Sequence, residues 1–209
     1  MFYEPDKRDR SLLPHDPFKA LISPRPVGWI STRGLKGEIN LAPYSFFNAF
    51  SGAPPIVGFC SEGFKDSAYL AKESGEFVWN LASFDLRDQM NATSAPLPRG
   101  ASEFEHAGLE MADCVLVKAP RVKASPASLE CKVTQVVRLD ALDGVQTDRY
   151  LVLGQVIGVH LNEAYLRDGI MDITLMKPLA RCGYQDYAVV DEVFALKRPA
   201  GAGNQAAGG

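Results

Sequence analysis

Long apolar segments are missing from this sequence of 209 residues. Its apolar runs, such as 54–60 and 150–161, are much shorter than the roughly 18 residues of a membrane-spanning helix. The first ten residues carry six charged side chains, and no apolar core segment of the kind that a secretory signal requires follows them. The sequence therefore predicts a protein of the cytoplasm, with no membrane as partner.

Cysteine is also scarce, and its spacing is unlike that of a metal site. The four cysteines include no Cys-x-x-Cys pair, and none of the three histidines has a ligand-like spacing from a cysteine. The residues concerned are Cys60, Cys114, Cys131 and Cys182, with His15, His106 and His160. We expect no metal site, and buried thiols that stay reduced.

An excess of charge of one sign is absent as well. The chain has 22 basic and 25 acidic residues, which leaves a net charge of −3 and no electrostatic reason to expect a nucleic-acid partner. With 46% hydrophobic and 22% charged residues, the composition is that of a globular domain, which we place at residues 1–198. Residues 199–209 are of low complexity and are expected to be a disordered tail.

What the sequence does contain is a series of β-type segments. Two extended runs, 25–33 and 39–47, flank a Gly-containing turn at 34–37 and predict a hairpin. Further strands are predicted at 56–60, 76–81, 114–122, 129–139 and 149–160. Helices are predicted at 65–74, with Gly75 as the C-cap, at 83–92, and at 102–108, where Ser102 and Glu105 match a capping box, with a helical turn at 162–166. Because no βαβ unit repeats, we expect a mostly β fold, closed as a barrel, with short inserted helices.

Polar and small residues gather at one end of the predicted hairpin. Ser31-Thr32-Arg33 ends the first strand, and Asn40 to Ser45, with Asn48, follows the turn. Small residues beside a proline let a flat ligand approach the backbone, whose N–H groups can bond its heteroatoms. The alternative is a plain hairpin whose hydroxyls and amides make turn bonds.

A second segment, Ser61 to Ser67, runs from a strand into a helix through Gly63. Free N–H groups at a helix start attract an anion, and Lys65 adds a full positive charge, so a phosphate is the natural ligand. Equally, Asp66 can serve as the helix N-cap and Lys65 as a solvated side chain. A third segment, Arg181 to Tyr187, places aromatic rings around Gly183. Its two tyrosines are suited to wall a ring system or to close the mouth of the barrel, and core packing is the simpler interpretation.

Several segments, in this order, resemble the flavin reductase-like, FMN-binding split-barrel family across residues 20–190. They are Pro24 to Thr32, Asn40 to Asn48, Lys65-Asp66-Ser67, Gly75 to Asn80, Ser102 to Glu105 and Leu129-Glu130-Cys131. Six collinear matches are more specific than any single one. The match is weaker at Arg181-Cys182-Gly183-Tyr184, where family members often carry Arg-Leu-Gly-Gly.

The resemblance implies a Greek-key split β-barrel that holds FMN at a homodimer interface. It implies ribityl and phosphate contacts from Ser31, Thr32, Arg33, Ser61, Lys65 and Ser67, with Asp66 in the same loop. It also implies isoalloxazine contacts from Ala42, Pro43, Tyr44, Ser45 and Asn48. Flavin chemistry needs little acid–base equipment from the protein, so no nucleophile is expected.

Three functions fit these features. The first is an oxidoreductase that transfers hydride from NAD(P)H to flavin and passes electrons to free flavin, a monooxygenase or another acceptor. No Rossmann unit is present, so NAD(P)H is expected to bind transiently over the flavin. The second is an electron-transfer protein with FMN as a fixed prosthetic group, and the third is a ligand-free structural barrel, which the Lys65 loop and the Ser31–Asn48 cluster oppose.

Overall fold

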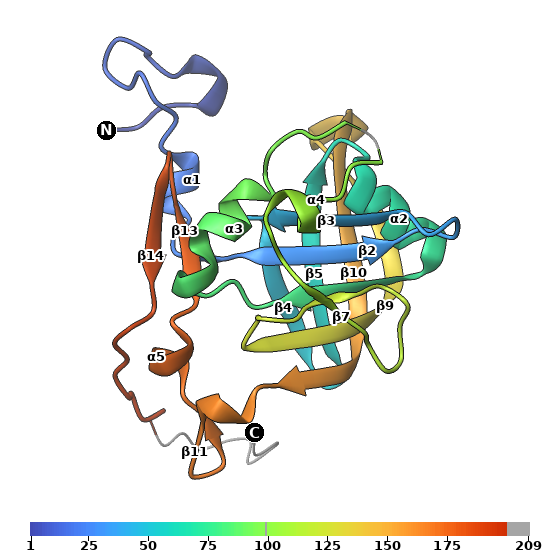
Figure 1. Ribbon diagram of the computed structural model, residues 1–209. Coiled ribbons are helices and arrows are strands. Elements are labelled where there is room, and N and C mark those ends of the chain that lie inside the picture. The colour runs from blue at the N-terminus through green and yellow to red at the C-terminus, as the bar shows by residue number, and fades with distance from the viewer. Residues whose placement is uncertain (99, 200–209) are drawn as a thin grey trace.

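The computed structural model describes residues 1–98 and 100–199, and its fold is mostly β (Figure 1). Seven strands form one antiparallel sheet in the order β3-β2-β6-β9-β10-β5-β4. Their bounds are β2 Gly28–Arg33, β3 Ile39–Tyr44, β4 Phe47–Gly52, β5 Pro55–Glu62, β6 Glu76–Asn80, β9 Ala127–Asp140 and β10 Gln146–Leu161. The edge strands β3 and β4 follow each other in the chain, and in the described residues they form no ladder with each other.

The predicted hairpin is confirmed as β2 and β3. Gly28 pairs with Tyr44 and Arg33 with Ile39, and the Gly34 N–H closes the turn on the Glu38 carbonyl over 2.8 Å. A Cβ on Gly28 would stand 2.7 Å from the Phe47 Cβ, so the start of β4 packs directly on the backbone of β2. This close approach brings the ends of β2, β3 and β4 together.

Short helices lie against the β2–β3 side of the sheet. Helix α2 (Asp66–Ser74) stops at Gly75, which adopts φ 75° as a left-handed C-cap, as predicted. The helix predicted at 83–92 divides into a 3-10 turn, η2 (Phe84–Leu86), and α3 (Arg87–Ala92). Helix α4 (Glu103–His106) begins at Ser102, whose hydroxyl accepts from the Glu105 N–H over 3.4 Å, in line with the predicted cap.

The core lies under these helices and inside the curved sheet. Trp29, Leu41, Met90 and Phe104 pack together between the β2–β3 hairpin and α3–α4. A second cluster fills the concave side of the sheet and includes Ile30, Phe59, Phe77, Cys131 and Val152, all of them fully buried. Burial of this apolar surface is the main stabilising term of the fold.

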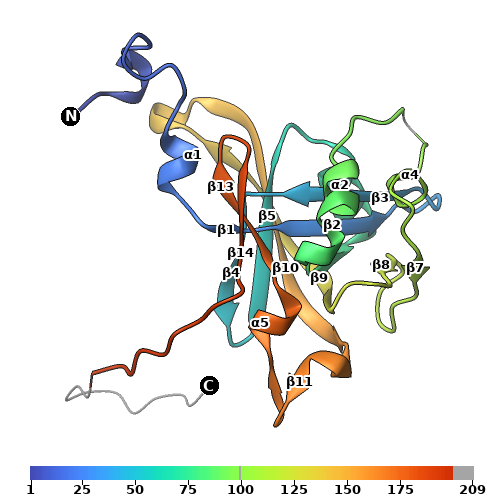
Figure 2. The same ribbon diagram turned by 60° about the vertical axis from the view of Figure 1, so that its left-hand side comes forward.

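The C-terminal part forms a second, smaller sheet beside the first. It joins β1 (Arg25–Pro26), β13 (Leu179–Gly183) and β14 (Asp186–Val189), and α1 (Phe18–Leu21) packs on β13 (Figure 2). The remaining elements are η1 (Pro5–Lys7), β7 (Met111–Ala112), β8 (Arg121–Val122), η3 (Leu142–Gly144), η4 (Glu163–Tyr165), β11 (Leu166–Arg167), β12 (Ile170–Met171) and α5 (Ile173–Met176).

The strand predicted at 114–122 is wrong except for its last two residues, which form β8. Two buried carboxylates accept hydrogen bonds from the backbone N–H groups that would otherwise pair with a neighbouring strand. Glu130 accepts from the N–H groups of Val115, Leu116 and Val117 at 2.8, 2.6 and 2.9 Å, and Glu76 accepts from the next two residues. Residues 115–119 therefore form a loop fixed by side chains.

The described residues contain no helix long and apolar enough to cross a membrane. The tail predicted at 199–209 lies, from residue 200 on, outside the described residues.

Candidate functional site

A cleft opens where the end of β3 faces the start of α2. Its volume is about 430 Å³, which is within the range of small-molecule sites. The loop after α3 forms its opposite wall. The lining residues are Asn40, Ala42, Pro43, Tyr44, Lys65, Asp66, Ser67, Thr93, Ser94, Ala95, Pro96, Leu97 and Glu103. Six of the twelve residues predicted to contact a cofactor are among them, so the structure brings the two predicted segments together.

The start of α2 offers free backbone donors to this cleft. Lys65 occupies the N-cap position without a side-chain cap bond, and the first helical bond runs from the Tyr69 N–H to the Lys65 carbonyl over 2.8 Å. The N–H groups of Asp66, Ser67 and Ala68 consequently have no partner within the helix. Together with the exposed Lys65 side chain, they place positive charge at this end of the cleft. Asp66 is the first helical residue and not the cap.

A hydrogen-bonded network behind the cleft fixes its floor. The Ser67 hydroxyl donates to Asn40 Oδ1, and Asn40 Nδ2 donates to Glu103 Oε1 over 3.1 Å. Glu103 Oε2 accepts from the Leu41 N–H over 3.2 Å. This chain of bonds links α2, β3 and α4, which are far apart in the sequence, and fixes three residues that line the cleft relative to one another.

Tyr44 stands between the cleft and the core. Its ring packs on Phe59, with 4.7 Å between the centroids. Burial raises the pKa of the Tyr44 phenol, while the neighbouring hydroxyls of Ser67 and Ser61 lower it less strongly. The phenol therefore stays neutral near neutral pH and is able to donate a hydrogen bond.

The other predicted contact residues lie elsewhere. Ser31, Thr32 and Ser61 are fully buried; the Ser31 hydroxyl donates to the Pro120 carbonyl and that of Ser61 to the Gly63 carbonyl. Thr32 Oγ1 is buried without a hydrogen-bond partner. Arg33 and Asn48 are exposed outside the cleft. Ser45 lines the adjoining cavity described next.

A second cavity, of about 280 Å³, adjoins the cleft at Pro43, Tyr44 and Ser94. Tyr184 and Tyr187 form part of its wall and are 50% and 41% exposed. The expectation that these tyrosines pack in the core is therefore wrong. Tyr184 lies in the β13–β14 turn with φ 45°, and Tyr187 lies on β14, the edge strand of the small sheet, so neither ring is enclosed by the core.

Cys114, Glu130 and His160 form a compact cluster, with ligand-type atoms within 4.8 Å of one another, although the sequence spacing gave no sign of it. His160 has a hydrogen-bond partner, because its Nε2 lies 2.6 Å from Glu130 Oε1. Burial raises the pKa of Glu130, but the three N–H donors and His160 outweigh it and hold the pKa below its ordinary value. Both carboxylate oxygens are thus already used by the protein.

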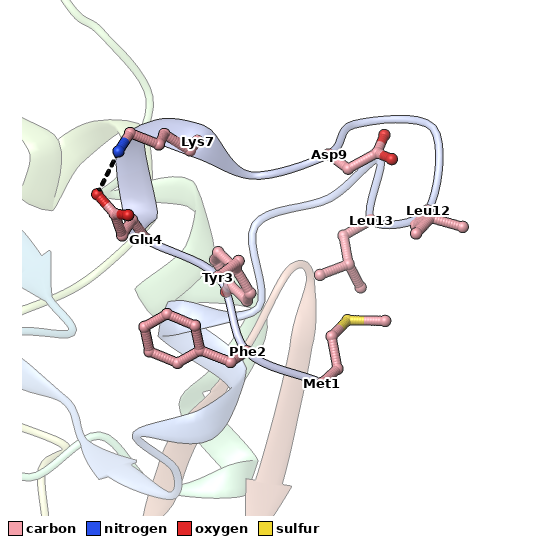
Figure 3. A pocket seen from close by; sticks show the side chains of 8 residues that line it. All are labelled: Met1, Phe2, Tyr3, Glu4, Lys7, Asp9, Leu12 and Leu13. Carbon is pink, nitrogen blue, oxygen red and sulfur yellow. Dashed lines mark ion pairs between the residues drawn. The ribbon is translucent and has the colours of Figure 1, made fainter.

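Residues of the N-terminal segment enclose a further pocket of about 320 Å³ (Figure 3). Its walls come from Met1 to Leu13 alone, with the Glu4–Lys7 ion pair of 2.8 Å at its edge. It shares no residue with the cleft.

Sequence reasoning missed the wall formed by residues 93–97 and the role of Glu103. The Pro-rich composition of 95–100 predicts a loop but not its location, and the family match at Ser102 to Glu105 assigned no role to Glu103.

Comparison with known proteins shows the family to which this chain belongs. The model of the flavin reductase like domain matches residues 21–177. An uncharacterized protein of Halalkalibacterium halodurans, BH2278, is 32% identical over 183 residues, covering 85% of this chain and 87% of its own. The chain therefore belongs to the flavin reductase-like family.

Solved structures agree in fold. Nitrilotriacetate monooxygenase component B from Bacillus cereus is 27% identical, with a TM-score of 0.85 over 94% of this chain and 98% of its own. Flavoredoxin of Desulfovibrio vulgaris is 19% identical, with a TM-score of 0.74 over 83% and 90% of the two chains. Membership of the flavin reductase-like family supports a flavin cofactor and an oxidoreductase activity.

Proposed function

We propose that this chain binds FMN in the cleft between β3 and α2 and acts as an NAD(P)H-dependent flavin oxidoreductase. The observation that carries the proposal is the open N-terminus of α2 with Lys65 at one end of the cleft and Pro43-Tyr44 at the other. A charged phosphate suits the first end, and a flat ring system suits the second.

The residues fit such a ligand in three ways. The N–H groups of residues 66–68 and the Lys65 ammonium would hold the phosphate, with the Ser67 hydroxyl beside them. The backbone of residues 42–45 would hydrogen-bond the edge of the ring. Thr32 Oγ1 has no partner in the described residues, and Ser31, Arg33, Ser61 and Asn48 remain proposed contacts that need local adjustment.

A bound flavin would supply the redox chemistry, accepting a hydride from the dihydronicotinamide while a solvent proton completes the reduction and NAD(P)⁺ leaves. The task of the chain is to orient the two rings and exclude water. The backbone donors of β3 are placed for the first task. The loop of residues 93–97 forms the opposite wall of the cleft and is suited to the second.

We further propose that the sheet closes as a split barrel and that two copies of the chain form a homodimer. Alternate residues on one face of β10, Ile157, Val159 and Leu161, are 36%, 58% and 48% exposed. An apolar stripe of this kind on a strand is suited to burial against a second chain.

We place the protein in the cytoplasm, where the reduced flavin would serve an acceptor such as a monooxygenase partner. Component B of such an enzyme shares the fold of this chain.

The first experiment is anaerobic. Purified protein loaded with FMN is mixed with NADH or NADPH, the flavin absorbance is followed, and the sample is filtered to separate free flavin. We expect bleaching within the mixing period and reduced flavin in the filtrate. Bleaching with all flavin retained would favour the fixed prosthetic group, and flavin left oxidised over minutes at saturating NAD(P)H would rule out the reductase.

A further inference from the structure

The cavity beside the cleft carries charge of one sign only. Its twelve lining residues include three cations, Lys19, Arg25 and Arg181, and no aspartate or glutamate. We call it the basic cavity. Asn91, Ser94 and Tyr184 add neutral hydrogen-bonding groups to its wall. A hollow lined by one sign of charge concentrates ions of the opposite sign.

Arg25 is the most informative of these residues because it is 93% buried, with a relative exposure of 7%. Its guanidinium donates to the carbonyls of Lys19, Ile22 and Ser45, the last over 3.2 Å. No carboxylate of the described residues lies within 4 Å of it. A buried cation that is held by carbonyls, without a counter-ion, is costly unless an anion binds nearby.

Lys19 and Arg181 are each positioned by an aromatic ring. The Lys19 ammonium lies 5.7 Å from the centre of the Phe46 ring, and Arg25 Cζ lies 5.8 Å from the same ring. Arg181 Cζ lies 4.5 Å from the centre of the Tyr187 ring, and its guanidinium donates to the Tyr184 carbonyl. These contacts orient the cations but leave their charge uncompensated.

The location of the basic cavity indicates its ligand. It shares Pro43 and Tyr44 with the cleft, so a molecule bound there would lie against the ring end of a flavin in the cleft. A volume of about 280 Å³ suits a molecule with a single ring and an acidic group.

We infer that the basic cavity binds the carboxylate or phosphate group of the molecule that exchanges electrons with the flavin. This inference rests on the proposed flavin site. The cations of the basic cavity would bind the co-substrate and not FMN. The FMN phosphate would lie at Lys65, on the far side of Tyr44. Arg25 fixes the wall of the cavity, while Lys19 and Arg181 contact the anion.

The test is a titration of the FMN-loaded protein followed by flavin absorbance. Benzoate is compared with benzamide, and nicotinamide mononucleotide with nicotinamide riboside, so that each pair differs in one anionic group. Saturable binding of benzoate alone identifies a carboxylated acceptor, and binding of the mononucleotide alone identifies the phosphate of the nicotinamide donor. Equal binding of the charged and neutral member of both pairs, or no binding, overturns the inference.

Lys19→Gln and Arg181→Gln are the variants, and Lys36→Gln in the exposed β2–β3 turn is the control with the same change of charge. Because each variant loses a charge-assisted bond, its affinity for the anionic probe is expected to fall on the order of tenfold. The control is expected to match the wild type. If both variants lower the affinity for FMN and leave the affinity for the anionic probe unchanged, the basic cavity is part of the flavin site and the inference fails.

FMN affinity is measured separately for every variant. If wild-type protein does not bind FMN, the proposed function fails, and calorimetric titration of the flavin-free protein with benzoate and the mononucleotide still decides whether the basic cavity takes an anion.

Discussion

Asn40 Nδ2 donates a hydrogen bond to Glu103 Oε1 over 3.1 Å, which joins β3 to α4 across 63 positions of sequence. The Asn40 side chain has both of its polar atoms engaged, because Oδ1 accepts from the Ser67 hydroxyl at the start of α2. An amide is needed here, since it presents a donor to the carboxylate and an acceptor to the hydroxyl at once.

Replacing Asn40 by aspartate should therefore open the floor of the cleft. Asn40→Asp places two carboxylates against each other and removes the donor to Glu103, so we expect the free energy of unfolding to fall by about 1–3 kcal/mol at pH 7. Chemical denaturation measures it. Asn48→Asp, on an exposed side chain, is the control, and equal losses in the two variants would contradict the role given to Asn40.

Glu130 is predicted to be the main support of residues 115–117. Glu130→Gln turns an acceptor of three N–H groups into a side chain that also carries donors, and we expect a loss of about 2–3 kcal/mol in unfolding free energy. Glu110→Gln removes an exposed pair with Lys123 and should change little. Similar behaviour of both variants would refute this assignment.

The same carboxylate predicts a dependence of stability on pH. The pKa of Glu130 is lower in the folded state than its ordinary value of 4.5, so its contribution is complete above that value and is lost as the pH falls through the folded pKa. The stability difference between wild type and Glu130→Gln should shrink over that acidic window. A difference that stays constant from neutral pH into this window would contradict the prediction.

Thiol labelling tests the packing around β9. Burial, with a smaller contribution from the Glu130 charge, raises the pKa of Cys131 to about 12, and the same two causes act on Cys114, also to about 12. In folded protein at pH 8, both should react far more slowly with a thiol reagent than after unfolding. Peptide mapping by mass spectrometry identifies the labelled positions, and rapid labelling of Cys131 in folded protein would show the packing to be wrong.

Gly154 on β10 leaves no room for a side chain in the core. A Cβ there would lie 2.4 Å from the Phe77 ring and 3.1 Å from the Cys131 Cβ, so Gly154→Ala should lose about 1–3 kcal/mol. At Gly52 nothing lies within 4 Å of an added Cβ, and Gly52→Ala should stay within about 0.5 kcal/mol of wild type. Thermal or chemical unfolding of the pair measures the contrast.

Local patterns in the sequence were sufficient for the elements nearest the site. The Gly34–Gly37 turn predicted the β2–β3 hairpin, and Gly75 predicted the end of α2, because both depend on residues close in the chain. The strand at 114–122 failed for the opposite reason. Its N–H groups are taken by Glu130 and Glu76, and no local pattern reveals a distant carboxylate that replaces a strand.

In the candidate site, too, residues placed by local sequence could be predicted, and residues placed by tertiary contacts could not. Lys65 and Ser67 could be found because a strand, a glycine loop and a helix follow one another around them. Ser31 and Thr32 were expected beside the ligand, yet which face of β2 is buried depends on α2 and on residues 117–122 packing over it. The basic cavity joins Lys19, Ser45 and Arg181 through tertiary contacts alone.

FMN binding by matched variants of α2 tests the central claim most directly. Lys65 lies at the N-cap and Lys72 in the last turn of the same helix, so Lys65→Ala and Lys72→Ala remove the same charge at opposite ends. We expect titration followed by flavin fluorescence to show binding to wild type and Lys72→Ala alike, and a loss of about 1.5–3 kcal/mol for Lys65→Ala. Equal FMN affinity in all three proteins would contradict the placement of the phosphate at α2.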